Sequence, residues 1–572
     1  MTRRKTLAAL LAAPLAMSVL ALSGPASAQP DTTQASADYT VLIEQGASRD
    51  AAVEAVTAAG GAVLQENDAI GTLTVRAPAT GFVQQVSASS AVFGATRTRP
   101  IGHLPKAEPS DRKPAGVEES SANPAPLRKD DPATAGMDPL DTNLWGLRMV
   151  RSDLARQVQA GDRRVLVGVL DSGIDATHPD LASKVDVGLS RNFTRDIPVD
   201  ETGAVVDGPC EFASCVDPPA YDDSGHGTHV AGTIAAAANG FGVSGVAPNV
   251  TLVSIRGGQD SGFVFLQPVL DALAYGADIG LDVINMSFYI DPWLYNCPNN
   301  PADSPEQQLE QRTTIAAVNR ALDYANKRGV TLVGSLGNNH EDLGHPRTDT
   351  SSPDFPAGAA HPRVIDNATC MDLPIEGNHV IGVSALGPTT AKADYSNYGV
   401  EQISLSAPGG YFRDGLGTPT YRTNENQILS TYPRNVLLAR GWIDAAGNVT
   451  PAGVTNAVVR YCDAGTCGYY RYIQGTSMAS PHVTGVAALV VSQYGHRDNH
   501  PSGLTMKPHK VERVLLESAA DHACPEPRLV SYVPVGRTPD FDAFCEGGPE
   551  FNGFYGHGIV DALAAVTRGD DD

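Results

Sequence analysis

The sequence predicts an α/β protein with a mainly parallel central sheet flanked by helices. From about residue 144 onward, short apolar runs such as 165–170 and 283–286 alternate with longer helical stretches. These runs are apolar throughout, as strands are when helices cover both faces of a parallel sheet. Regular alternation of strands and helices predicts layered α/β packing. We find no internal repeat.

The first 28 residues are typical of an export signal. Arg3, Arg4 and Lys5 precede an apolar run over 7–22, and the segment closes on Ala26-Ser27-Ala28. A membrane anchor is the alternative, but the run is short for a span and contains Pro14. The pair of arginines could also indicate export by the twin-arginine route, but the flanking residues support this poorly. We therefore expect ordinary secretion, with no membrane anchor.

Residues 29–103 predict a small α/β unit ahead of the main domain. A strand is expected at 39–43, a helix at 51–59 that ends at Gly60-Gly61, and another strand at 72–75. Residues 104–138 lose this periodicity and are rich in Pro, Lys, Glu, Ser and Asp, which indicates an exposed linker.

The main domain is expected over 139–568, followed by an acidic tail at 569–572. Its candidate strands and helices come in chain order. The strands are 165–170, 252–255, 283–286, 330–333 and 380–383, and the helices are 228–238, 268–277, 314–327 and 478–493.

Eight cysteines fit an exported chain stabilised by disulfides. The close pairs suggest small loop staples, a third pair would close a longer loop, and the last pair follows by elimination. A zinc site is the alternative, but no C-x-x-C spacing supports it. The expected pairs are Cys210–Cys215, Cys462–Cys467, Cys524–Cys545 and Cys297–Cys370.

A formal net charge of −23 argues against a nucleic-acid partner, because phosphate binding needs clustered Lys and Arg. The acidity says more about solubility than about chemistry.

Three short segments each place a reactive side chain at the boundary of a predicted element. The first contributes an aspartate and the second a histidine. In GVLDSGID (168–175), Asp171 directly follows a buried strand, at the sheet edge where open α/β sheets build their sites. In DDSGHGTHVAGT (222–233), His226 opens a helix of small residues. His226 and His229 could both bind a metal, but no acidic third ligand accompanies them. We expect His229 to be a packed structural histidine.

The third segment, GTSMASPHV (475–483), places Ser477 at the start of an apolar helix. Pro481 is compatible with a first helical turn. Free N–H groups and the helix dipole there favour a developing negative charge. Ser480 is the rival nucleophile but lies further inside the helix.

In this order, the three segments resemble the Asp, His and Ser signatures of the subtilases, a family of serine endopeptidases. The resemblance extends over about 144–566 and includes ADYSNYG (393–399), APG (407–409) and GHGIVDA (556–562). It implies a three-layer subtilisin-like fold and peptide-bond hydrolysis through an acyl-enzyme. A non-catalytic binding protein is disfavoured by the complete machinery. An esterase is disfavoured because it expects G-x-S-x-G and the order Ser, acid, His.

By the same resemblance, Asn338 is the oxyanion asparagine, with Asn339 as the competing choice. Ser287, Phe288 and Tyr289 would line one side of the substrate, where many relatives have Leu-Gly for the last two. The bulkier Tyr289 is expected to narrow the pocket. The opposite wall of the pocket would comprise Ser335, Leu336 and Gly337. Asp354 would form the floor of the pocket and favour Arg or Lys before the scissile bond, with a solvated loop aspartate as the alternative.

The resemblance also implies structural calcium and no organic cofactor. Oxygen ligands from separated loops suit Ca²⁺, although loop polar residues without metal are the alternative. The implied ligands are Asp141, Asp180, Asn239 and the carbonyls of Ala237, Phe241 and Val243.

The unit at 29–103 resembles the family's propeptide, which implies an intramolecular inhibitor. The remaining partner would be a protein or peptide substrate of a monomeric enzyme. Segments 191–221, 289–312 and 411–470 exceed a minimal subtilase. They are expected either to extend the cleft rim or to decorate the surface.

Overall fold

The computed structural model describes residues 36–97, 100–103, 138–199, 205–289, 292–353, 359–497 and 503–568. The predicted export signal, nearly all of the predicted linker, the acidic tail and Asp354 lie outside the described residues. Within the described part, no helix is both long and apolar enough to cross a bilayer.

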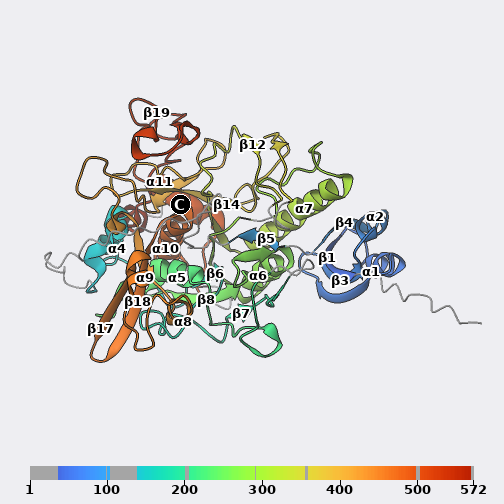
Figure 1. The fold of residues 1–572 in the computed structure, drawn as a ribbon, viewed down its shortest axis with the longest axis horizontal. Coiled ribbons are helices and arrows are strands. Elements are labelled where there is room, and N and C mark those ends of the chain that lie inside the picture. Colours follow the sequence, from blue (N-terminus) through green and yellow to red (C-terminus); the bar gives the residue numbers. More distant parts are fainter. Residues whose placement is uncertain are drawn as a thin grey trace, which may run out of the picture. The chain divides into compact units, whose positions relative to one another are not determined.

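A seven-stranded sheet in which every pairing is parallel forms the centre of the fold (Figure 1). Its order is β15-β14-β11-β10-β6-β8-β7, which confirms the predicted parallel sheet. The strands are β6 (Leu166–Leu170), β7 (Arg191–Asn192), β8 (Thr251–Arg256), β10 (Val283–Met286), β11 (Thr331–Ser335), β14 (Val380–Leu386) and β15 (Leu405–Pro408).

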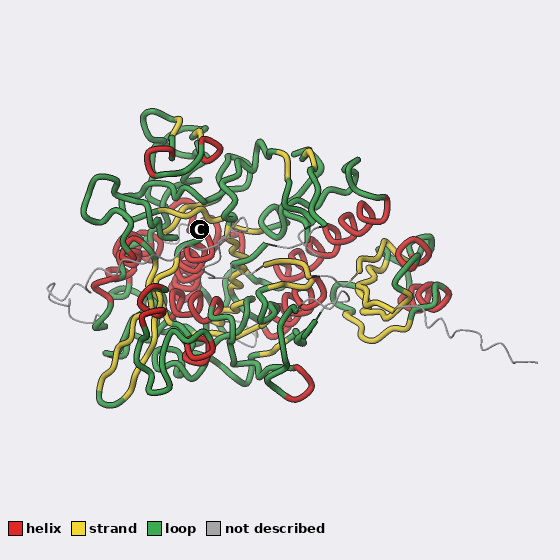
Figure 2. The backbone as a smooth tube through the Cα atoms, in the orientation of Figure 1, coloured by secondary structure: helices red, strands yellow, loops and turns green. Residues whose placement is uncertain are grey.

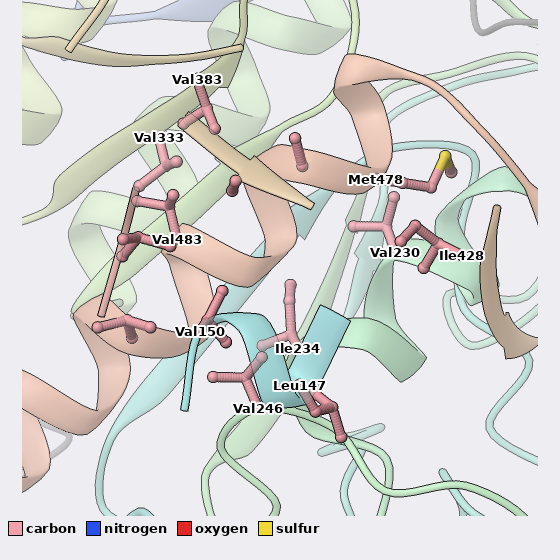
Figure 3. Close-up of a cluster of buried hydrophobic side chains, with 14 of the residues drawn as sticks. Leu147, Val150, Val230, Ile234, Val246, Val333, Val383, Ile428, Met478 and Val483 are labelled. Carbon is pink, nitrogen blue, oxygen red and sulfur yellow. The ribbon is translucent and has the colours of Figure 1, made fainter. Parts of the chain in front are cut away.

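Two layers of helices cover the two faces of this sheet. On β6, Val167 and Val169 pack into the apolar cluster that includes α5 (His226–Ala235) and α10 (Thr476–Tyr494). Figure 3 shows this cluster, with Val230 of α5 and Val483 of α10 among its members. Leu166 and Leu170 pack on the other face, against α6 (Leu266–Ile279) and α7 (Pro305–Lys327). Because side chains alternate along a strand, each strand anchors both layers.

The segment 36–97 folds as a four-stranded antiparallel sheet with two helices, in the order β2-β3-β1-β4. It contacts the helices on one face of the central sheet. Asn67 Nδ2 donates to Asp271 of α6 at 2.6 Å, and Arg320 of α7 donates to the Ile43 carbonyl at 2.7 Å. The elements are β1 (Ser36–Ile43), α1 (Arg49–Ala58), β2 (Ala62–Asn67), β3 (Thr72–Pro78), α2 (Phe82–Val86) and β4 (Val92–Arg97).

The segment 411–470 builds much of a second antiparallel sheet, in the order β16-β18-β17. Figure 2 shows it as a long strand pair, and Figure 1 labels its strands β17 and β18. Its strand β18 ends three residues before α10, so this sheet leads directly into the Ser477 segment. Its elements are β16 (Ile428–Thr431), α8 (Arg434–Ala439), α9 (Pro451–Thr455), β17 (Val458–Asp463) and β18 (Thr466–Ile473).

The remaining elements are short or lie at the periphery. They are β5 (Pro100–His103), α3 (Trp145–Met149), α4 (Ser152–Ala155), β9 (Phe263–Phe265), β12 (Thr348–Asp349), β13 (Arg363–Val364), α11 (Pro508–Ser518), β19 (Leu529–Val530), β20 (Ala543–Phe544) and α12 (Ala562–Thr567).

All four predicted disulfides are present. Cys210–Cys215 and Cys462–Cys467 each span a sequence separation of 5, and Cys524–Cys545 spans 21. Cys297–Cys370 spans 73 residues and therefore constrains the chain most.

Candidate active site

The candidate site lies where the order of the central sheet reverses. From β6 the chain goes on to β7 and β8 on one side, then returns to β10 on the other. Asp171 is the residue immediately after β6, at its carboxyl end. In open parallel sheets, this switch point is where the loops on either side part and leave room for a ligand.

Asp171 and His226 form a buried hydrogen-bonded pair. Nδ1 of His226 lies 2.7 Å from Asp171 Oδ1, and the side-chain exposures are 3% and 0%. The Ser172 N–H also donates to Oδ1, at 2.8 Å, which fixes the carboxylate. A carboxylate acceptor at Nδ1 keeps a proton on that nitrogen, so Nε2 is the nitrogen able to accept a proton.

Asp222 holds the chain that carries His226. Its Oδ1 accepts from Ser172 Oγ at 3.0 Å and from the Gly225 N–H at 2.9 Å. Its Oδ2 accepts from the backbone and the hydroxyl of Thr228, so one carboxylate caps the first turn of α5. Burial raises the pKa of Asp222. This residue was absent from the predicted site, although its place in the quoted DDSGH segment is a recognisable capping signal.

The small residues of α5 permit its close approach to Asp171. A Cβ added at Gly227 would lie 2.1 Å from the carbonyl oxygen of Gly173 and 3.1 Å from the Asp171 side chain. Any larger residue would push the His226 turn away from the strand end. Gly225, which precedes the helix, has φ +96°, a conformation that favours glycine.

His229, three residues after His226 on α5, is fully buried. Its Nε2 is within 3.1 Å of two backbone carbonyls, those of Ile428 and Arg471. Burial lowers the pKa of His229 to about 3, so it is neutral at ordinary pH. The ring is therefore buried between α5 and the backbone of β16 and β18, which agrees with the expected structural role.

Ser477 lies in the first turn of α10, facing the end of β10. Its Oγ donates to the Ser287 carbonyl at 3.3 Å. The rival Ser480 is fully buried, and its hydroxyl is 2.8 Å from Ser287 Oγ. Asn285 Nδ2 also donates to Ser287 Oγ, at 2.7 Å. Ser480 thus belongs to a packed polar network between β10 and α10, which leaves Ser477 as the better candidate.

Asn338 is tied directly to the residue before Ser477. Its Oδ1 accepts from both the N–H and the hydroxyl of Thr476, each at 2.9 Å. The competing Asn339 is buried, and its N–H donates to Asn397 Oδ1 at 3.0 Å. Asn397 also donates to the Leu336 carbonyl, so it holds the whole loop. No local signal revealed these roles of Thr476 and Asn397, because their partners are distant in sequence.

The predicted substrate-binding side chains are largely turned inward. Phe288 is buried with the α6 and α7 cluster, whereas Leu336 is fully buried in a second cluster that includes the Cys297–Cys370 bridge. Tyr289 is half-buried and packs against this second cluster. Gly337 donates to Thr476 Oγ1 at 3.1 Å. Ser287 and Ser335 are buried at the ends of β10 and β11.

Five of the six implied calcium residues, all except Asp141, lie in or contact the loop 237–243. Asp180 Oδ2 accepts from the Val243 N–H and from Tyr470, at 3.1 and 2.8 Å. Its Oδ1 is buried without a hydrogen-bond partner among the described residues, and burial raises the pKa of Asp180 to about 7. Asn239 is exposed, and its Oδ1 accepts from the Phe241 N–H at 2.9 Å.

Asp141 is arranged differently from Asp180. Its carboxylate accepts from the N–H and the hydroxyl of Ser244 and lies 3.7 Å from Arg156. Asp138, absent from the prediction, instead reaches the loop and accepts from the N–H groups of Asn239 and Gly240.

Comparisons with known proteins agree with this geometry. A sequence model of the subtilase family matches residues 162–558. The chain is 28% identical to fervidolysin of Fervidobacterium pennivorans over 388 residues, which are 67% of this chain and 41% of fervidolysin. It is also 28% identical to subtilisin DY of Bacillus licheniformis over 352 residues, 61% of this chain and 85% of that protein. The match thus spans less than half of fervidolysin but most of subtilisin DY.

Solved structures show the same fold. The epidermin leader peptide processing serine protease of Staphylococcus aureus aligns with a TM-score of 0.58 and 18% identity, covering 94% of this chain and 99% of that one. The crystal structure of fervidolysin aligns with a TM-score of 0.55 and 23% identity, covering 94% and 62%.

Proposed function

Since this chain belongs to the subtilase family, we propose that it is a serine endopeptidase with Asp171, His226 and Ser477 as its catalytic triad. The observation that carries the proposal is the buried 2.7 Å contact between His226 Nδ1 and Asp171 Oδ1. It supports the role because it sits at the sheet's switch point, and because Ser477, in the first turn of α10, faces the end of β10, the strand beside β6.

In the proposed reaction, His226 Nε2 takes the proton of Ser477 as Oγ attacks the peptide carbonyl carbon. Asp171 keeps the imidazole in the correct tautomer and stabilises its charged form. The same imidazolium then protonates the leaving amine, and the acyl-enzyme remains on Ser477. Water, deprotonated by His226, hydrolyses this ester and restores the serine.

The tetrahedral oxyanion is stabilised by donors fixed in advance. We assign Nδ2 of Asn338 and the backbone N–H of Ser477 to this role. Both Thr476 donors occupy the oxygen end of the Asn338 amide, so the NH₂ end is the one left for the substrate. The N-terminus of α10 adds a favourable dipole. Backbone at 287–289 and 335–337 would pair with the substrate on either side, and Asp354 would favour Arg or Lys.

The N-terminal unit is proposed to inhibit the enzyme until it is removed. Strand β5, in the chain ahead of the main domain, pairs antiparallel with β9. Val264 of β9 bridges to Gly258, and the Gly258 N–H donates to the Asp171 carbonyl at 3.1 Å. An extended peptide added to a strand edge is how a substrate would bind. This supports 29–103 as a propeptide.

The four disulfides support an extracellular, secreted enzyme.

Structural calcium is proposed at the loop 237–243. The unpartnered, buried Asp180 Oδ1 fits a cation, which would also balance the charge of this carboxylate. Oxygen donors from Asn239 and from the carbonyls of Ala237, Phe241 and Val243 would complete the set. Asp141 is left out because Ser244 and Arg156 already satisfy it. Bound calcium would stabilise the loop that follows α5.

A fluorophosphonate probe tests the nucleophile. The probe should modify the mature protein once, at Ser477, and tandem mass spectrometry distinguishes this from Ser480 in the same peptide. His226→Ala should abolish labelling, because the hydroxyl is then no longer activated. Labelling at Ser480, or none in a protein that cleaves peptides, would refute the assignment.

A further inference from the structure

A second group of acidic side chains lies apart from the triad and from the loop 237–243. We define the acidic cluster as Asp196, Asp217, Asp223 and Asp260. One carboxylate oxygen from each of Asp196, Asp217 and Asp260 lies within 4.8 Å of the other two. Asp217 also forms such a group with Asp223 and the exposed Glu211. Asp196 and Asp217 come from the segment 191–221, whereas Asp260 follows β8 and Asp223 precedes His226.

One buried cation sits in this cluster but does not balance it. Arg256 has 0% side-chain exposure, lies 2.7 Å from Asp217 and 3.3 Å from Asp223, and also contacts Asp260. Four carboxylates thus face one guanidinium, which leaves a formal excess of three negative charges.

Asp196 is the member that the protein itself does not satisfy. It is 5% exposed, and both of its carboxylate oxygens are buried without a hydrogen-bond partner among the described residues. No described Lys, Arg or His forms an ion pair with it. Burying a carboxylate is costly unless it is paired or binds a metal. Its oxygen nevertheless points to the same small space as those of Asp217 and Asp260.

We propose that the acidic cluster binds a divalent cation, with calcium as the ion that its chemistry fits best. Oxygens at most 4.8 Å apart can share one ion at the Ca–O distances of about 2.3–2.6 Å. The side chains of the acidic cluster offer carboxylate oxygens and no His or Cys ligand, and such oxygens suit a hard cation such as calcium better than zinc. With Asp196 and Asp217 only 5% and 2% exposed, an ion fits this space better than the long side chain of a basic substrate residue.

This site gives the segment 191–221 a role. The ion would join two residues of that segment to the end of β8 through Asp260. Asp223 forms an ion pair with Arg256, as Asp217 and Asp260 do, and it is the neighbour of Asp222, which caps the helix turn of His226. Binding would therefore stabilise the chain on which the histidine depends.

Calorimetric titration with calcium tests the proposal. Full-length Ser477→Ala protein, which cannot digest itself, is stripped with chelator and titrated with calcium chloride. Asp196→Asn in this background should lose one equivalent, or bind it at least about tenfold more weakly. The matched control, Asp521→Asn, removes an exposed carboxylate elsewhere and should bind like the parent. Unchanged stoichiometry and affinity in a folded Asp196→Asn protein would overturn the proposal.

A second variant keeps the test decisive if Asp196→Asn does not fold. Asp180→Asn removes the carboxylate of the other calcium site and leaves the acidic cluster intact, so one equivalent should remain. A folded Asp180→Asn protein that binds no calcium would contradict the second site. An arginine peptide that binds the parent, but not Asp196→Asn, in place of calcium would instead make the cluster a substrate subsite.

Discussion

Replacing Asn338 with alanine removes the proposed side-chain donor to the oxyanion while leaving the triad intact. The Asn338 amide is held at its oxygen end by two hydrogen bonds from Thr476. Its nitrogen is therefore oriented before substrate arrives, and the enzyme spends no free energy in reorganising it. A donor fixed in this way acts mainly on the transition state, where the negative charge develops.

The expected loss is about 100- to 1,000-fold in kcat, or about 3–4 kcal/mol of transition-state stabilisation, as for loss of one such donor in a subtilisin. KM should change little, because the interaction is weak in the ground state. Thr476→Val leaves Asn338 with one anchoring hydrogen bond instead of two. Losing a bond worth about 1 kcal/mol predicts a smaller decrease in kcat, about fivefold.

Steady-state kinetics on a fluorogenic peptide would measure both parameters, with thermal unfolding as a check on folding. Asn339→Ala is the matched control, because the side chain of Asn339 makes no described hydrogen bond to the Ser477 segment. We expect it to keep kcat within about tenfold. Near-normal kcat in Asn338→Ala, with a large loss in Asn339→Ala, would refute the assignment and shift the oxyanion donor by one residue.

Three further predictions concern the triad, a disulfide and calcium. Asp171→Asn should lower kcat by about 10,000-fold in single-turnover assays, because the imidazole is left in the wrong tautomer. Replacing Cys297 and Cys370 with serine in the Ser477→Ala background should reduce the free energy of unfolding in urea by about 4 kcal/mol, against about 2 for a staple with a separation of 5. Because the pKa of Asp180 is raised to about 7, the folded, metal-free protein keeps a proton on this carboxyl up to about pH 7, whereas the unfolded chain loses it near pH 4. Stability in chelator should therefore fall as pH rises from about 4 to 7, by up to about 4 kcal/mol, and Asp180→Asn should lack this slope.

The sequence predicted the central layers well because buried parallel strands are short apolar runs. Element ends were less predictable. Helix α7 begins at Pro305, not near 314, because Ser304 and Gln307 form a capping box and the first turns are polar. Apolar periodicity does not detect such turns. The capping signal itself was present in the sequence.

The sheet β16-β18-β17 shows what a single sequence does not reveal. Its strands pair across loops, and the backbone carbonyls of residues 428 and 471 hold His229. The hydroxyls of Ser430 and Thr431 also donate to backbone carbonyls of α5, each at 2.7 Å. Backbone carbonyls have no sequence signature. The same holds for Asn397, whose bonds to the loop 336–341 span about sixty residues.

Candidate site residues were predictable in type but not in orientation. The motifs predicted Asp171, His226 and Ser477 as the triad. Of the described residues predicted around them, Ser287 follows β10 and Ser335 ends the neighbouring strand β11. The sequence could not show that Ser287 and Leu336 turn into the interior, because both faces of their strands are covered. Nor could spacing show that Asp138 reaches the loop 237–243 whereas Asp141 faces Arg156.

Cleavage of a mixed peptide library tests the central claim most directly. Mature wild-type protein and Ser477→Ala protein are incubated with the library in parallel, and mass spectrometry identifies the cuts. The proposed mechanism predicts cuts by wild type alone, with enrichment of Arg or Lys before the bond if Asp354 forms the pocket floor. Equal cleavage by Ser477→Ala, or no cleavage by folded, propeptide-free wild type, would contradict the claim that this chain is a Ser477-dependent endopeptidase.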